Sequence, residues 1–447
     1  MSLSEKIFLV ALLVTAAAVG LVNVFLMPPF MNPDEIQHFM FSADYAYNDE
    51  QLKQLDGSVL QLLKDHNWFH FIGVGPGWEN IDKIEDIYYL NYFSRRKVSI
   101  SRSYFHFLYG KILKYSGVTD TLSAFYLLRM VSFFIYMGIF VLALFFYRAC
   151  FPGTWQYFIS AHLLIFQPAT ILNSVNYDVL LTLLGVLFFI SAYRFLVTDE
   201  KRNLVFLVLL AALASLVKTG GVLFFIYFFI LLMFKYKVSL KFLKRAALAV
   251  FLFIIVFSWF NYLFPERFFT LYTVIFSKLH ALTGNGASGG GAGNSLGFFN
   301  AVVDSFFFHT GWMAFKLHNA WYIVLKLFLL ISIVGAIAGA AVSRLKTPAV
   351  EKKWLLYSMV VIVLQLLMIR LYYGTGFMAQ GRYLYPLIIP VITLIYSGLF
   401  SIDRYLKFKR NYLVLSYMVF LFLLFLSALV RVLWVFYLGV PSPHPGL

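Results

Sequence analysis

The sequence predicts an all-α integral membrane protein with about eleven transmembrane helices and a long first loop outside the membrane. Hydrophobic residues make up 61% of the chain and charged residues 13%, and the mean hydropathy is +0.81. Such a composition does not provide a water-soluble surface. The apolar runs are about 20 residues long, and as helices they cover a hydrocarbon core of roughly 30 Å. Lysine and arginine gather in a few short connections, which is typical of loops on the cytoplasmic side.

The chain 1–447 is interpreted as a single polytopic membrane domain. The first apolar run is interpreted as an uncleaved anchor, because it continues to Met27 and only Lys6 precedes it as a basic residue. Helices are expected throughout, since lipid offers no partner to backbone polar groups. In chain order the predicted spans are 7–27, 122–147, 156–173, 178–197, 203–217, 220–234, 246–264, 319–343, 354–373, 383–402 and 411–438.

Basic residues in three short loops predict the orientation. With the N-terminus cytoplasmic, these loops fall on one side, and the segments 28–121, 265–318 and 374–382 face outward. The basic residues that set the membrane topology then account for most of the net charge of +16, so this charge does not call for a nucleic-acid partner. The basic residues are Lys235, Lys237, Lys241, Lys244 and Arg245; Arg344, Lys346, Lys352 and Lys353; and Arg404, Lys407, Lys409 and Arg410.

Two outward loops are long. The loop 28–121 is too long for a simple connection, so we expect it to be functional and to carry interfacial helices, one beginning at Asn32 and another near 103–114. The loop 265–318 contains a glycine-rich segment at 284–297, which is interpreted as a flexible connection or a lid. This segment lacks the Gly-Lys-Ser/Thr ending of a phosphate-binding loop.

The stretch from Asn32 to His38 directly follows the first span and admits two interpretations. Asn32 as N-cap, Pro33 at the first helical position and Glu35 in a capping box describe the start of a helix. Alternatively, helical spacing brings Asp34, Glu35 and His38 to one patch, which is typical of a site. Asp34 and Glu35 are therefore candidate catalytic residues, as general bases or as ligands of Mg²⁺ or Mn²⁺, and His38 is a candidate substrate contact.

A second group of polar residues is expected at the outward membrane boundary. Arg382, next to Gln380 and Tyr383, offers a bidentate fork to a phosphate, although interfacial anchoring also explains an arginine and a tyrosine there. Lys218 joins two short apolar spans, where it costs a few kcal/mol unless a phosphate or a carboxylate pairs with it. Asp178 opens the fourth span as a helix cap or as a wall of the site.

Three short motifs stand out in this chain. They are Pro33-Asp34-Glu35-x-x-His38, Asn176-x-Asp178, and Gln380-Gly381-Arg382-Tyr383 before Pro386. Together they resemble the motifs of the GT-C superfamily of membrane glycosyltransferases and, more narrowly, those of a bacterial branch with a Pro-Asp-Glu-x-x-His motif after the first span. The plan is also similar to that of protein mannosyltransferases and lipid A aminoarabinose transferases.

This resemblance implies a transferase in the bacterial inner membrane, surrounded by membrane lipids. It would move a sugar, usually with inversion, from a polyprenyl-phosphate donor to an envelope glycan or lipid acceptor on the outer face. Asp34 would be the base or a metal contact, with Glu35 its neighbour, and Arg382 would contact the carrier phosphate. Two alternatives stay open. A lipid-linked sugar flippase would use a similar cationic groove without needing a base, and it would more often have inverted repeats or broken helices, which the sequence does not reveal. A polysaccharide polymerase or ligase would rely on arginine and histidine in a large late outer loop.

Overall fold

All regular elements of the described residues are helices. The computed structural model describes residues 3–69, 81, 103–151, 155–198, 201–237, 239–263, 295–309, 316–341, 352–373, 379–408 and 411–438. Within those ranges, seven helical segments are long and apolar enough to cross a membrane. They are α1 (Leu3–Leu26), α7 (Thr121–Cys150), α10 (Tyr177–Thr198), α16 (Asn319–Ala341), α17 (Lys352–Tyr373), η5 with α18 (Gly381–Leu387 and Ile388–Tyr405) and α19 (Tyr412–Tyr437).

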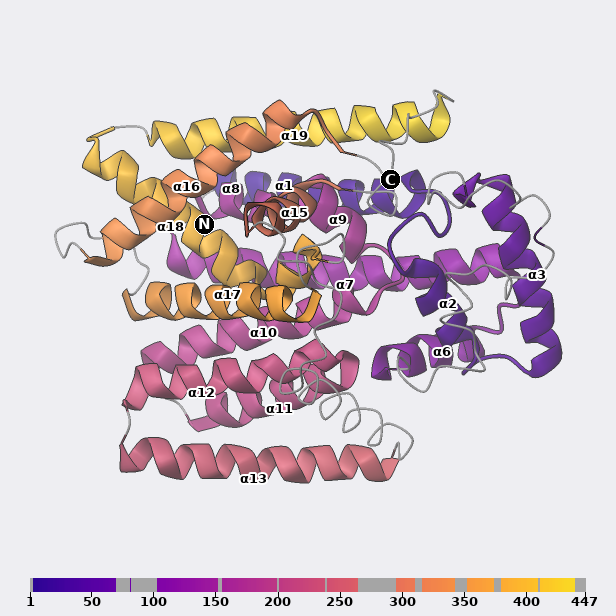
Figure 1. Ribbon diagram of the computed structural model, residues 1–447, viewed down its shortest axis with the longest axis horizontal. Coiled ribbons are helices and arrows are strands. Elements are labelled where there is room, and N and C mark those ends of the chain that lie inside the picture. Colours follow the sequence, from indigo (N-terminus) through magenta and orange to yellow (C-terminus); the bar gives the residue numbers. More distant parts are fainter. Residues whose placement is uncertain are drawn as a thin grey trace.

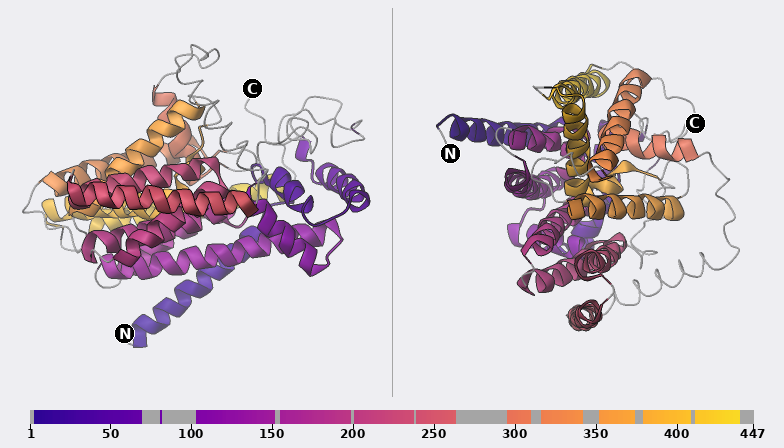
Figure 2. Two further views of the ribbon diagram at one scale, coloured as in Figure 1. Left: turned by 90° about the horizontal axis from the view of Figure 1, so that it is seen from below. Right: turned by 90° about the vertical axis from the view of Figure 1, so that its left-hand side faces the viewer.

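These segments confirm the predicted helical architecture and suit a multi-pass membrane protein, while the number eleven stays a prediction. Three predicted spans fall on α11 (Lys201–Val217), α12 (Leu223–Tyr236) and α13 (Leu240–Leu263). In Figure 1 the axes of the helices α7, α10, α12, α13, α17 and α19 are roughly parallel. Figure 2 shows α1 leaning out of the bundle at its N-terminal end. Exposed apolar side chains on α1, such as Val10 and Val14, suit contact with lipid.

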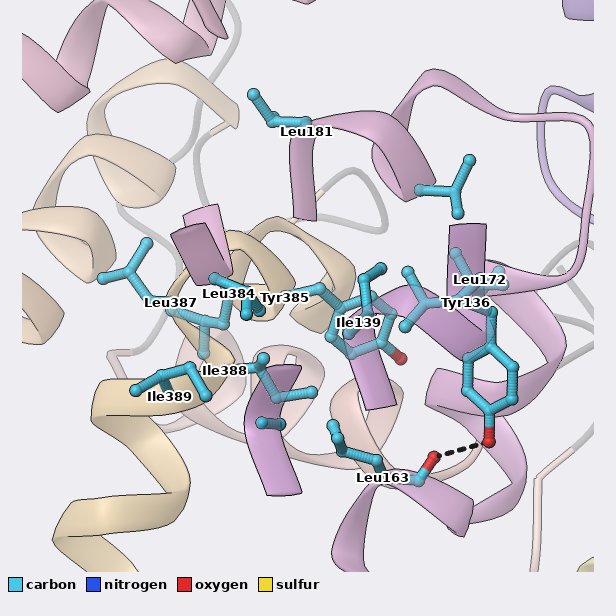
Figure 3. Close-up of a cluster of buried hydrophobic side chains, with 14 of the residues drawn as sticks. Tyr136, Ile139, Leu163, Leu172, Leu181, Leu384, Tyr385, Leu387, Ile388 and Ile389 are labelled. Atoms are coloured by element: carbon cyan, nitrogen blue, oxygen red, sulfur yellow. Dashed lines mark hydrogen bonds between the residues drawn. The ribbon is translucent and has the colours of Figure 1, made fainter. Parts of the chain in front are cut away.

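The predicted span 156–173 is not one continuous helix, because this segment is broken into three pieces. They are α8 (Trp155–Ala161), the 3₁₀ helix η3 (His162–Leu164) and α9 (Phe166–Leu172). Pro168 accounts for the break: its ring clashes with the carbonyl four residues earlier, at Leu164, where η3 ends. A carbonyl released by the break still finds a partner, since Tyr136 Oη donates to Leu163 O at 3.4 Å (Figure 3).

The loop 28–121 contains helices near both expected places, α2 (Glu35–Ala43) and α6 (Tyr104–Ser116), and a third helix that was not expected, α3 (Asp49–Asp65). The three gather beyond one end of the long helices in Figure 1. Residues 70–80 and 82–102 of this loop lie outside the described residues. In the second loop the described part is α15 (Ser295–Phe307) with the two residues after it and 316–318, and most of the glycine-rich segment lies outside it.

Helices α16 and α18 approach so closely that only glycine fits at their crossing. A Cβ on Gly398 would lie 1.8 Å from Ser332 O, and one on Gly335 would lie 2.2 Å from Gly398 O. We expect Gly398→Ala to lower the free energy of unfolding by about 1–3 kcal/mol through overpacking. Thermal unfolding in detergent measures this effect. The matched control is Gly138→Ala in α7, where nothing lies within 4 Å of the added Cβ, and equal stability of the two variants would contradict the prediction.

Candidate functional site

Asp34 lies immediately before α2 in a strained backbone conformation. Its φ is 63° and its ψ is 4°, in the left-handed region, and its side chain makes no capping hydrogen bond. Such a conformation costs roughly 1–2 kcal/mol for a residue with a Cβ, so the surrounding contacts have to enforce it. The prediction that Asn32 caps a helix beginning at Pro33 is wrong, because α2 begins at Glu35. The Asp34 carboxylate instead accepts a hydrogen bond from Arg382 Nη2.

Glu35 is completely buried in a salt bridge with Arg129 of α7. Arg129 Nε and Nη2 donate to the two carboxylate oxygens at 2.8 and 2.7 Å, and neither side chain is exposed. The remaining N–H groups of Arg129 donate to the carbonyls of Val24, Met27 and Pro28, so that the arginine also closes the end of α1. The Glu35–Arg129 pair therefore links α2, α7 and the end of α1. Glu35 faces Arg129 and Asp34 faces Arg382, so the two carboxylates do not form the single patch that their spacing predicted.

Two carboxylates and two cations form a chain of alternating charge. Arg382 bridges the carboxylates, since Nη2 donates to Asp34 and Nε lies 3.8 Å from Asp178 Oδ2. Lys218 Nζ then donates to Asp178 Oδ1 at 2.7 Å. The structure thus brings together Asp34, Asp178, Lys218 and Arg382, which we call the charged cluster. Lys218 has its expected carboxylate partner, which offsets the cost of a lysine at this depth.

The charged cluster is mostly buried, with one partly open side. The Asp34 side chain is 24% exposed and that of Lys218 11% exposed, compared with 7% for Arg382 and 2% for Asp178. Asp178 Oδ2 and Arg382 Nε make no hydrogen bond within the described residues. Buried charged atoms without hydrogen bonds are costly. These two atoms therefore suit a ligand whose polar groups form hydrogen bonds with them.

Close backbone packing holds Arg382 in place at the start of η5. A Cβ on Gly381 would lie 2.3 Å from Val302 O in α15, so glycine is required there, and Gly381 N donates to Ser305 Oγ at 2.7 Å. Side chains of η5 also belong to the buried apolar cluster of Figure 3, together with side chains from α7, η3, α9, α10 and α18. The backbone next to Arg382 is therefore held rigidly by its packing against α15.

Two of the other predicted contacts, Tyr383 and His38, lie beside the charged cluster. Lys218 Nζ lies 4.7 Å from the centre of the Tyr383 ring and 4.2 Å from that of Tyr177, at cation–π distance. Gln380 is the N-cap of η5, and its buried Oε1 has no hydrogen-bond partner within the described residues. The ring centres of His38 and Tyr177 are 4.2 Å apart. Tyr383 and His38 therefore lie beside the charged cluster, whereas Glu35 is directed to Arg129.

The comparisons with known proteins give no further guide. No protein-family model, curated protein or solved structure matches this chain. The function is therefore inferred from the charged cluster and from the motifs that contribute to it.

Two residues of this region were missed by the sequence analysis, Arg129 and His106. Arg129 had a signal, since an arginine inside an apolar span calls for a partner. His106 had only its place in an expected interfacial helix. It is fully buried on α6, and its Nε2 lies 2.8 Å from Nδ1 of His38. Burial, helped by the positive charges of Arg382 and Lys218, holds the pKa of His38 well below its usual value, so that this imidazole is neutral at pH 7.

The predicted Mg²⁺ or Mn²⁺ site at Asp34 and Glu35 does not fit the donor atoms. Glu35 directs its oxygens to Arg129 and to Val175 N, and Asp34 is engaged by a cation. Within the part of the chain that the structure describes, no group of three His, Cys, Asp or Glu side chains could hold a metal ion. We therefore derive no step that passes through a metal.

An apolar cavity of about 440 Å³ lies elsewhere in the bundle. It is lined by α1, by the broken segment with His162, and by α18 and α19. It contains none of the residues of the charged cluster. Its polar lining is limited to a few atoms, so it does not provide the groups that phosphate or sugar chemistry needs.

Proposed function

We propose that this protein is a membrane glycosyltransferase. It takes a sugar from a polyprenyl-phosphate donor and joins it to an envelope glycan or lipid acceptor on the outer face of the bacterial inner membrane. The observation that carries this proposal is the pairing of a partly exposed carboxylate, Asp34, with a buried arginine, Arg382, beside the Lys218–Asp178 ion pair. The resemblance of the three motifs to the GT-C superfamily supports it, because all three motifs contribute to this place.

The cations of the charged cluster suit a phosphate leaving group. Arg382 Nη2 now binds Asp34, and an entering phosphate competes for the same guanidinium with the bidentate geometry that arginine favours. When Arg382 turns to the phosphate, the Asp34 carboxylate is released toward the acceptor. Phosphate binding would then prepare the base as well as the leaving group.

The transfer itself is a single displacement at the anomeric carbon. The acceptor hydroxyl oxygen forms the new bond to this carbon, and the bond to the carrier phosphate oxygen breaks with its electron pair left on the phosphate. Asp34 takes the hydroxyl proton as the bond forms. Arg382 and Lys218 stabilise the charge that develops on the phosphate. In this proposal Glu35 is not catalytic, because Arg129 and Val175 N occupy its oxygens.

A flippase for the same lipid is the second candidate, and one observation favours it. Transporters place their sites at interrupted helices, and the described residues contain such breaks at α8–η3–α9 and at the 3₁₀ helices η4 (Thr219–Val222) and η5. Lys218 immediately precedes η4, and Arg382 lies in η5. A flippase needs the cations but no base. A polymerase or ligase has no such observation, since most of the loop 265–318 lies outside the described residues.

One reconstitution separates the two candidates. Purified protein in liposomes is given a synthetic polyprenyl-phosphate donor with a labelled sugar and a pool of envelope-glycan and lipid acceptors, with and without EDTA. Labelled product is measured alongside the movement of a fluorescent donor between the leaflets. The transferase proposal predicts product in both buffers. Movement of the donor without any product would favour the flippase, and product lost only with EDTA would reinstate a metal.

Arg382 variants test the phosphate contact. We expect Arg382→Lys to raise the KM for the donor about tenfold, because lysine keeps the charge but loses the bidentate fork. Arg382→Gln loses both and is expected to raise it about a hundredfold, in line with a lost charge-assisted contact. Steady-state kinetics over a range of donor concentrations measure both effects, and thermal unfolding checks that the variants are folded. Equal KM values in wild type and Arg382→Gln would remove Arg382 from donor binding.

A further inference from the structure

His106 is held in one protonation state by the backbone of its own helix. It is the third residue after Ser103, the N-cap of α6, and Ser103 N donates to His106 Nδ1 at 2.7 Å. A backbone N–H can only donate, so His106 Nδ1 carries a lone pair and the proton of the neutral ring is on Nε2. Glutamate or glutamine usually takes this position in a capping box.

The same reasoning extends from His106 to His38. His106 Nε2–H faces His38 Nδ1 at 2.8 Å, which makes Nδ1 the acceptor. The proton of His38 is then on Nε2, and a second proton on Nδ1 would point at the N–H of His106. The lowered pKa of His38 agrees with a neutral ring. With Nδ1 occupied and Nε2 protonated, His38 has no nitrogen left to act as a base.

The protonated nitrogen of His38 is the atom that lacks a partner. His38 is 4% exposed, and its Nε2 makes no hydrogen bond within the described residues. A buried N–H without an acceptor is unfavourable. The ring packs edge-on against Tyr177, whose own ring lies 4.2 Å from Lys218 Nζ, so His38 adjoins the charged cluster. The titratable or charged groups around His38 are His106 from α6, Tyr177 and Asp178 from α10, Asp34 before α2, Lys218 before η4 and Arg382 in η5.

We infer that His38 is a neutral hydrogen-bond donor to an oxygen of the substrate, and that His106 is the positioning residue that fixes it in this form. The inference rests on the proposed function for the identity of the substrate. The oxygen belongs either to the carrier phosphate or to the transferred sugar, both of which accept hydrogen bonds. This role leaves Asp34 as the base, because His38 cannot take the proton of the acceptor.

Two substitutions at His106 differ in one group only. In His106→Gln the side-chain oxygen accepts from Ser103 N, and the amide N–H₂ donates to His38 Nδ1 as the histidine does. In His106→Glu the second oxygen accepts instead, so the proton of His38 moves to Nδ1 and Nε2 becomes an acceptor. Both variants keep the cap of α6, but His106→Glu also buries a negative charge, so the thermal unfolding of both variants is measured beside their donor binding.

The first readout does not depend on activity. Nitrogen NMR of ¹⁵N-histidine protein in liposomes, with the signal of His38 assigned by its loss in His38→Asn, reports which ring nitrogen carries the proton. We expect the Nε2–H form, without titration between about pH 6 and pH 8, in wild type and in His106→Gln, and the Nδ1–H form in His106→Glu. A wild-type signal from the Nδ1–H form or from the charged ring would overturn the inference, whether or not the protein transfers sugar.

The second readout is binding. We expect His106→Glu to bind the sugar-linked donor about tenfold more weakly than His106→Gln does, the effect of one lost hydrogen bond. Binding of polyprenyl phosphate without sugar shows which oxygen accepts the hydrogen bond from His38. The same loss of affinity with this probe assigns the contact to the phosphate, and no loss assigns it to the sugar. Equal binding of the sugar-linked donor by the two variants would overturn the role of His38. Failure of sugar transfer in wild type, with these binding differences intact, would reject the proposed function and leave the donor role in place.

Discussion

Asp34→Asn is expected to reduce sugar transfer by about 10²- to 10⁴-fold, the usual contribution of a general base. Asparagine has nearly the same shape and still accepts a hydrogen bond from Arg382 Nη2 through its oxygen. It cannot take up a proton under these conditions, so the chemical step fails while the site keeps its form. The rate of labelled-product formation at saturating donor measures the loss, and binding of polyprenyl phosphate is expected to stay within about threefold of wild type.

The control for this result is a carboxylate in the same cluster that is not proposed as a base. Asp178→Asn removes the charge that pairs with Lys218, so it is expected to change donor binding more than the turnover number. A loss of binding in Asp34→Asn as large as its loss of turnover would make Asp34 a structural residue. Unchanged turnover in Asp34→Asn would exclude it as the base.

Arg129→Met is expected to destabilise the protein by about 3–5 kcal/mol, because it leaves the buried Glu35 carboxylate without its counter-ion. Three backbone carbonyls at the end of α1 lose their donor at the same time. The measurement is thermal unfolding in detergent, followed by tryptophan fluorescence. The double variant Glu35→Gln/Arg129→Met is expected to recover part of the loss, since no unpaired charge remains.

A more exposed ion pair provides the comparison. Lys326 and Asp304 pair at 2.8 Å with side chains 25% and 15% exposed, so Lys326→Met is expected to cost less than about 1 kcal/mol. If Arg129→Met were no more costly than Lys326→Met, the Glu35–Arg129 pair would not organise the segment that precedes α2. In that case the left-handed conformation of Asp34 would need another explanation.

The chemistry of the charged cluster was readable from residue types. An arginine, a lysine and two aspartates beside membrane spans are too costly to leave unpaired, and the structure does bring them together. The capping interpretation failed because tertiary contacts outweigh local helix-start preferences at this position. Asn32 and Pro33 favour a start two residues earlier, whereas the contact of Arg382 with Asp34 and that of Arg129 with Glu35 turn consecutive carboxylates to different partners.

The sequence by itself determined the helical membrane class of this protein and most of the residues that surround the charged cluster. Long apolar runs can satisfy their backbone in lipid only as helices, and isolated charges among them demand partners. Only the tertiary structure decided which partners these are. The pairing of Glu35 with Arg129 and of His38 with His106 joins residues that are 94 and 68 positions apart. No local pattern encodes such pairs, because helix packing sets the distances between them.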